Sequence, residues 1–229
     1  MATPQFSIYI HSGPNPWKVI IILEELGLSY RTITVDTKSG DQKKAPYTAL
    51  NPNGRMPTLV DHSNNDFVVW ESGAIILYLV EKYDAGADSK LAFAKFESNA
   101  TAKQWLMFQM SGQGPYFGQA AWFKNFHAET IPSAIERYDK EIDRVLGVLN
   151  DVLTDKEYLV ENRVSYADLS FVTWLIVLDW PTMGGGAWKS DERFSAVRAW
   201  YERLSERDSV KAMKEIKAAG KDGVFGVKA

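Results

Sequence analysis

The sequence contains no cysteine among its 229 residues. It therefore forms no disulfide bond, and it offers no thiolate to a zinc ion, to an iron–sulfur cluster or to nucleophilic catalysis. Its three histidines, His11, His62 and His127, lie far apart and match no spacing of metal ligands. We therefore expect no metal site, and we interpret His62, in the stretch DHSNND, as an ordinary loop residue.

Long apolar runs and an excess of one charge are also missing. No stretch approaches the roughly 20 apolar residues that cross a membrane. The net charge is -3 and the basic residues are scattered, so we predict neither a membrane nor a nucleic acid as partner. The first residues, MATPQFSIYI, lack the basic segment of a signal peptide, which favours a cytoplasmic location. The glycines of SGQGPYFGQ do not have the spacing of a dinucleotide-binding loop.

The first third of the sequence alternates between strand and helix patterns. Phe6, Ile8 and Ile10 predict a half-buried strand, and a helical spacing of apolar residues follows from Pro16 until Gly27 can end the helix. The remaining predicted elements are strands at 30–36, 56–62 and 66–71 and a helix from Ser72 to about Tyr83. This order predicts a small mixed sheet with helices packed against it.

The rest of the sequence is helical almost throughout. The small, polar stretch DAGADSK at 84–90 is typical of a linker, and long apolar stripes follow, as in the segment 131–153. We therefore divide the chain into a domain at 1–84, a linker at 85–94 and an all-helical domain at 95–229. Inside that domain, Ser165 and Asp168 in VSYADL predict a capping box at the start of a helix, which is a structural device rather than a catalytic carboxylate.

The stretch SGPNPWKV at 12–19 is the first candidate for chemistry. Asn15 followed by Pro16 fits an N-cap and the first helical position, and that structural role explains both residues. The alternative is that Asn15 holds a polar group where a reaction needs one. Other stretches bear on that choice.

Two later stretches place further polar groups near the ends of predicted strands. If the Met56–Pro57 bond is cis, the backbone N–H and C=O of Met56 face outward from the sheet edge, where an extended peptide can pair with them. Glu71 and Ser72 lie where a strand meets a helix, and they can bind the ammonium and the carboxylate of an amino acid or serve as another helix cap. The polar, basic loop GDQKKAP at 40–46 can face the same edge.

Taken together, the sequence resembles the glutathione transferase family over nearly its whole length. The resemblance rests on the helix-opening turn, on NPNGRMPTLVDH and WESGAIILYLVEKY, on the helical second half and on SYADLS. It implies a thioredoxin-like α+β N-terminal domain followed by an all-α domain, and usually a homodimer. SGPNPWKVIIILEELGL, SGQGPYFGQAAWF and IPSAIERY are similar to a fungal and bacterial branch that includes a yeast nitrogen-regulator and prion protein and Nu-class enzymes.

The resemblance also implies roles for individual residues. In this branch Asn15 would face the sulfur of glutathione, and Met56 would pair with the backbone of its cysteinyl residue. Glu71 and Ser72 would hold the γ-glutamyl end. The glycine end would meet Gln42, together with Arg55 or with Arg137, which can reach across the dimer.

The group that stabilises the thiolate is Asn15 or Ser12. Ser12 matches the catalytic serine of the serine-type classes if Gly13 and Pro14 are aligned without a gap. The tyrosine-type classes are not matched, because Tyr9 lies within the first strand, upstream of the turn.

The implied function is conjugation of glutathione to small apolar electrophiles, with a role in detoxification. Reduction of peroxides or disulfides is a further option, and because cysteine is absent it would use glutathione sulfurs only. The alternative is a glutathione-binding regulator without turnover, which the start of the chain close to its first strand disfavours. For the electrophile site we expect some members of an aromatic group whose other members form the core or dimer contacts: Trp105, Phe108, Tyr116, Phe117, Trp122, Phe123 and Phe126.

Overall fold

The structure is a computed structural model that describes residues 4–86, 88–219 and 227–228. The chain forms two compact units, one made of the residues up to Ala92 together with those from Arg207 onward, the other of Phe93–Glu206. Among the described residues, none of the helices combines the length and the apolar character needed to span a membrane.

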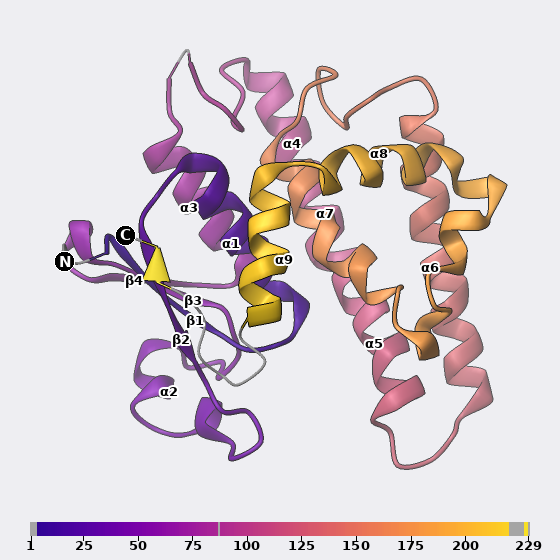
Figure 1. The fold of residues 1–229 in the computed structure, drawn as a ribbon, viewed down its shortest axis with the longest axis horizontal. Helices are drawn as coiled ribbons and strands as arrows, with labels where there is room; N and C mark the ends of the chain where they lie inside the picture. The colour runs from indigo at the N-terminus through magenta and orange to yellow at the C-terminus, as the bar shows by residue number, and fades with distance from the viewer. Residues whose placement is uncertain (1–3, 87, 220–226, 229) are drawn as a thin grey trace. The chain divides into compact units, whose positions relative to one another are not determined.

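The first unit is built on a mixed sheet with the strand order β4-β3-β1-β2-β5 (Figure 1). β1 runs parallel to β2, with Ile8 opposite Thr32, and antiparallel to β3, with Ile8 opposite Leu59. The other two pairs, β3 with β4 and β2 with β5, are antiparallel. The strands are β1 Phe6–Ile10, β2 Tyr30–Thr34, β3 Thr58–Asp61, β4 Phe67–Trp70 and β5 Val227–Lys228. The first four confirm the predicted strands, with shorter ends.

β1 is covered on both faces, whereas the sequence pattern predicted a half-buried strand. The alternation was misleading because Ser7, on the second face, is only 2% exposed. Its hydroxyl accepts a hydrogen bond from Arg31 Nε at 2.7 Å and lies 2.7 Å from His62 Nε2. His62 Nδ1 in turn lies 2.6 Å from Asp66 Oδ1. These spacings resemble a hydrolytic triad, but the buried hydroxyl is held by Arg31, so the network joins β1, β2 and the β3–β4 turn.

In the part of the first unit that the structure describes, the α-helices are α1 Pro14–Leu26, α2 Tyr47–Leu50, α3 Ser72–Tyr83 and α9 Asp208–Ala219. α1 ends where the sequence predicted, because Gly27 adopts the left-handed conformation at φ 67 and its amide bonds to Glu24 O. α3 has the predicted bounds. A short 3₁₀ turn, Asp41–Lys43, precedes α2.

α9 packs against α1 within the first unit (Figure 1). Arg207 donates to both carboxylate oxygens of Glu25, at 2.6 and 2.8 Å, and Ser209 Oγ donates to the same carboxylate at 2.6 Å. The sequence-based division assigned this helix to the C-terminal domain. The structure groups it with the sheet instead, because Arg207 binds Glu25 on α1. These two residues are about 180 positions apart in the chain, so no local pattern indicates their contact.

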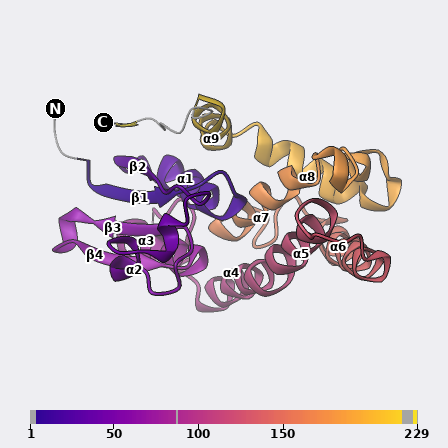
Figure 2. The same ribbon diagram turned by 90° about the horizontal axis from the view of Figure 1, so that it is seen from below.

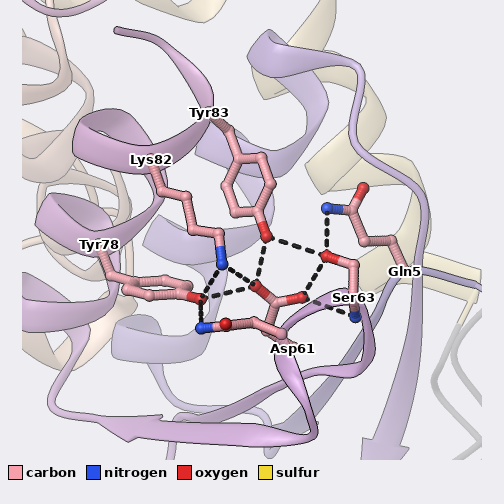
Figure 3. A network of polar contacts seen from close by, with 7 residues as sticks. Gln5, Asp61, Ser63, Tyr78, Lys82 and Tyr83 are labelled. Atoms are coloured by element: carbon pink, nitrogen blue, oxygen red, sulfur yellow. Dashed lines mark hydrogen bonds and ion pairs between the residues drawn. The ribbon is translucent and has the colours of Figure 1, made fainter.

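A buried carboxylate fixes the C-terminal end of α3 (Figure 3). Asp61, at the end of β3, accepts hydrogen bonds from Tyr78 Oη at 2.6 Å and from the hydroxyl of Tyr83. Burial opposes its charge, but the bonds from these tyrosines and from Ser63 keep the pKa of Asp61 below its ordinary value. Because the C-terminal ends of β3 and α3 are joined in this way, their N-terminal ends are held side by side.

The second unit is helical, as predicted, and is arranged around the buried helix α7. Its helices are α4 Phe96–Phe108, α5 Gly114–Asn125, α6 Pro132–Leu153, α7 Tyr166–Val177 and α8 Ser195–Ser205, with 3₁₀ turns at Pro181–Met183, Ala187–Ser190 and Glu192–Phe194. The glycine-rich segment is a π-helical turn, Gln109–Gln113, through which α4 runs on into α5 (Figure 2).

The predicted capping box is confirmed at the start of α7. Asp168 Oδ2 accepts the amide of Ser165 at 2.9 Å and its hydroxyl at 2.8 Å. The other oxygen, Oδ1, accepts the amide of Leu159 at 2.9 Å and Trp200 Nε1 at 3.0 Å. The carboxylate is fully buried, so its role is to join α7 to two other segments of the unit.

Candidate functional site

The candidate site is a pocket of about 240 Å³ in the first unit. It lies where the N-termini of α1 and α3 meet the segment that precedes β3. Its lining residues are Asn15, Asn51, Asn53, Arg55, Met56, Pro57, Glu71 and Ser72. Five of the residues singled out from the sequence are therefore in one pocket.

The helix α1 starts at Pro14, one proline earlier than the sequence-based interpretation placed it. The N-cap is Gly13, in an extended conformation at φ -70 and ψ 164, and Pro14 occupies the first helical position. Asn15 is therefore not the N-cap. The earlier proline begins the helix because its restricted φ already fits the first turn. Asn15 is thereby placed inside that turn, where it lines the pocket.

The pocket floor is a loop fixed by the buried side chain of Asn51. Its Nδ2 donates to Arg55 O at 2.7 Å and to Thr58 Oγ1 at 3.1 Å, and its Oδ1 accepts the amide of Asn53 at 3.0 Å. Tyr47 Oη adds a second donor to Arg55 O at 2.6 Å. The carbonyl oxygen just before Met56 therefore accepts hydrogen bonds from two side chains.

Met56 lines the pocket together with Pro57. The Met56–Pro57 bond is cis, as the sequence-based hypothesis required. The side chain of Met56 packs into a small core with Val35 and Tyr47.

Gly54 brings the loop at 40–46 against this floor. Its φ is +61, and a Cβ there would lie 2.6 Å from Gln42 O. Lys43 Nζ also donates to Asn53 O at 2.9 Å. Within the described residues, the buried Oε1 of Gln42 has no hydrogen-bond partner. The basic loop therefore contacts Asn53 and Gly54, next to the pocket, and Gln42 is not among the residues that line the pocket.

Glu71 and Ser72 form the opposite wall at the start of α3. Glu71 is the N-cap, with φ 72 and ψ 118, an unfavourable conformation for a side-chain-bearing residue. Its carboxylate accepts a hydrogen bond from Asn53 Nδ2 at 3.3 Å. The first intrahelical bond runs from the amide of Ile75 to Glu71 O, so the amides before Ile75 precede the helical hydrogen-bond ladder.

The buried amine of Lys18 interacts electrostatically with Glu71. Lys18 is one turn beyond Asn15 on α1 and is only 1% exposed. Burial lowers the pKa of Lys18 to about 7, and the negative charge of Glu71 opposes that shift. The ionisation of Lys18 is therefore coupled to the carboxylate at the pocket wall.

The remaining predicted site residues lie elsewhere. Ser12 is exposed in the turn before α1 and, among the described residues, is not one of those that line the pocket. Arg137 belongs to the helical unit, on the exposed side of α6, with its Nη1 4.0 Å from Glu141 Oε1. Sequence reasoning did not single out Asn51 and Asn53, although the turn signature NPNG just before Arg55 marks both.

The aromatic group of the helical unit divides into buried and exposed members. Phe117 and Trp105 are buried, whereas Trp122 and Phe126 are 49% and 61% exposed. No cluster of three or more side chains suited to hold a metal ion occurs among the residues that the structure describes.

Comparison with known proteins gives the ancestry of this fold and pocket. The family model "Glutathione S-transferase, N-terminal domain" matches residues 4–81, and the C-terminal domain model of the same family matches residues 132–203. The chain belongs to the glutathione S-transferase family. It is 47% identical to glutathione S-transferase 2 of Schizosaccharomyces pombe over 227 residues, which cover 95% of this chain and 98% of that protein.

Solved structures of this family resemble the chain closely. The glutathione transferase URE2P6 of Phanerochaete chrysosporium, in complex with oxidised glutathione, aligns with a TM-score of 0.89 at 49% identity and covers 94% of this chain and 97% of its own. Ure2p5 of the same fungus, cocrystallised with 1-(S-glutathionyl)-2,4-dinitrobenzene, aligns with a TM-score of 0.87 at 41% identity, covering 97% and 99%.

Proposed function

We propose that this glutathione S-transferase family member binds glutathione in the pocket of the first unit and transfers its thiolate to apolar electrophiles. The observation that carries the proposal is the convergence of Asn15, Met56, Glu71 and Ser72 on one cavity. Related structures that contain glutathione or its dinitrobenzene conjugate support the same ligand.

The two ends of a γ-glutamyl group match the charges of the pocket wall. Its α-ammonium would pair with the carboxylate of Glu71, and its α-carboxylate would accept hydrogen bonds from Ser72 and the first amides of α3. Helix N-termini attract anions because their amides and the helix dipole both present positive charge. The cysteinyl backbone would pair with Met56, as a strand added to the sheet edge. The glycine end would meet Gln42 and Arg55, with Arg137 supplied by a partner subunit in a homodimer.

Asn15 can supply enough stabilisation to ionise the thiol. A free thiol has a pKa of about 8.5, so the thiolate is a minority species at neutral pH. A helix N-terminus contributes about 0.3–1 kcal/mol to an anion, and a hydrogen bond to a charged group contributes about 1.5–3 kcal/mol. Since one pKa unit corresponds to about 1.4 kcal/mol, these effects together lower the thiol pKa by roughly one to three units before desolvation opposes them.

Conjugation then needs no protein side chain with a shifted pKa to act as general acid or base. The glutathione thiol releases its proton to water, and the thiolate attacks the electrophilic carbon. With an aryl halide, a carbon–sulfur bond forms and the carbon–halogen bond breaks, releasing halide. We assign the electrophile to aromatic residues of the helical unit, and we place the enzyme in the cytoplasm in a detoxifying role. Reduction of a peroxide or a small disulfide would consume two glutathione molecules, because the sequence offers no cysteine for a mixed disulfide.

Turnover by wild type and by Asn15→Ala tests this proposal. The substrates are a dinitrobenzene halide, an isothiocyanate, a peroxide and a small disulfide, and glutathione affinity is measured by calorimetry. We expect Asn15→Ala to lower kcat/KM for conjugation by about ten- to hundred-fold, the effect of losing a hydrogen bond to a charged sulfur, with little change in glutathione affinity. Tight glutathione binding without turnover of any substrate would instead support the regulator.

A further inference from the structure

His11 packs directly against the turn that carries Asn15. The amide of Gly13 donates to His11 Nδ1 at 3.0 Å. The imidazole ring also lies over Gly13, since a Cβ at that position would be 2.2 Å from His11 Cε1. The ring therefore fixes the backbone of the N-cap residue of α1 through both a hydrogen bond and steric contact.

This hydrogen bond requires a neutral ring. Nδ1 accepts only when it carries no proton, so the ring proton lies on Nε2. Two features of the first unit favour the neutral form. Burial lowers the pKa of His11, and the positive charge of Lys217 on α9 lowers it further.

Lys217 is held in place over α1. Its Nζ lies 5.5 Å from the centre of the Trp17 ring, and burial lowers the pKa of this amine as well. Lys18 is a buried amine on α1 itself, and Glu71 is the charge that acts on it. Lys217 is the charged group from a neighbouring element that acts on His11.

We propose that His11 is a positioning residue for the thiolate site: its imidazole holds the turn from Ser12 to Asn15 through the hydrogen bond from the amide of Gly13 and its contact with that residue. The inference rests on the proposed function, because it concerns the same sulfur. A protonated ring would turn an N–H toward the amide of Gly13. The hydrogen bond is then lost, two donors face each other, and the start of α1 is no longer held against the sulfur.

Two substitutions separate the hydrogen bond from the ring. His11→Phe keeps a flat ring over Gly13 but removes the acceptor. His11→Asn keeps an acceptor, its Oδ1, near the position of Nδ1 but cannot be protonated. The pKa of the bound glutathione thiol is measured from the ultraviolet absorbance of the thiolate, and the pH profile of kcat/KM is recorded for each variant.

We expect His11→Phe to lower the thiolate fraction at neutral pH about ten-fold, which corresponds to a thiol pKa about one unit higher. His11→Asn should restore the wild-type thiol pKa. In wild type the acid limb of log kcat/KM should be steeper than a slope of one over about one pH unit, because protonation of His11 removes about a further ten-fold of the thiolate. His11→Asn should keep a slope of about one throughout.

Lys217→Met gives a test of opposite sign. Removing the positive charge should raise the pKa of His11, so the steep part of the acid limb should move to higher pH and the amide resonance of Gly13 should titrate there. A wild-type thiol pKa and acid limb in His11→Phe would overturn the inference. If Asn15→Ala behaves as wild type while His11→Phe raises the thiol pKa, the proposed donor is wrong but the role of His11 stands, acting through the turn's amides.

Discussion

Glu71 combines a strained backbone with a charge at the pocket wall, so its replacement should separate stability from binding. Its φ of 72 and ψ of 118 fall outside the regions that side-chain-bearing residues favour. Such a conformation costs about 1–3 kcal/mol. Glycine adopts it freely but loses about 0.4–1 kcal/mol through the entropy of the unfolded chain. We therefore expect Glu71→Gly to stabilise the folded protein by about 1 kcal/mol, with a range of roughly 0 to 2.5.

The same substitution should abolish tight glutathione binding. Removing the carboxylate leaves the ammonium of the γ-glutamyl group without its partner, which costs about 1.5–3 kcal/mol, or a ten- to hundred-fold weaker affinity. Glu71→Gln is the matched control, because it keeps the backbone strain and loses only the charge. It should bind glutathione as weakly as Glu71→Gly without the gain in stability. In both variants the pKa of Lys18 should fall, since Glu71 is the charge that raises it.

Urea denaturation and calorimetric titration with glutathione measure these two effects. The reasoning fails if Glu71→Gly unfolds at lower urea than wild type, because the strain would then not be stored at this residue. It also fails if either variant binds glutathione with the affinity of wild type, because the carboxylate would then not contact the ligand.

Three further substitutions test the framework around the site, each by urea denaturation. Gly54→Ala should cost about 1–3 kcal/mol and weaken glutathione binding, because its φ is +61 and the new Cβ would lie 2.6 Å from a backbone oxygen; wild-type stability would contradict the close approach. Asp168→Asn should cost about 1–3 kcal/mol, because its amide turns donors toward buried donors; a loss well below about 1 kcal/mol would show that the network is not stabilising. Burial opposes the charge of Glu25, but bonds from Arg207 and Ser209 hold its pKa below the ordinary 4.5. Its contribution to stability is therefore present above that pH and is lost as the pH falls through the native-state value, so the destabilisation by Glu25→Gln should fade in acid.

Local patterns predicted much of the first unit. α3 has the predicted bounds from Ser72 to Tyr83, and Gly27 ends α1. In the second unit, the capping box of Ser165 and Asp168 is present as predicted. These features depend on residues a few positions apart, so their physical causes are visible in the sequence. The start of α1 was misplaced by two residues, because Pro14 and Pro16 are both compatible with the first helical turn.

Contacts between distant residues were not predictable in this way. The pairing of Glu25 with Arg207, which places α9 in the first unit, leaves no periodic pattern. His62 looked like a loop residue, yet it bonds to Ser7, which lies 55 positions earlier in the chain. The hydrogen bond between Gly13 and His11 is local, but no sequence pattern indicates it, because it depends on how the ring folds back over the glycine.

The pocket itself was predictable in part. Met56, Glu71 and Ser72 lie next to the ends of strands and helices, and the sequence marks those ends. Asn51 and Asn53 act by holding the loop, and their hydrogen bonds were not deducible from the turn signature alone.

The central claim is that the sulfur of bound glutathione is stabilised at the start of α1. The most direct measurement is a crystal structure of the protein with glutathione, in which the distance from the sulfur to Asn15 Nδ2 is determined. The account predicts hydrogen-bond contact there, with the γ-glutamyl group at Glu71 and Ser72. A sulfur remote from this helix start, or a tripeptide bound away from Met56, would contradict it.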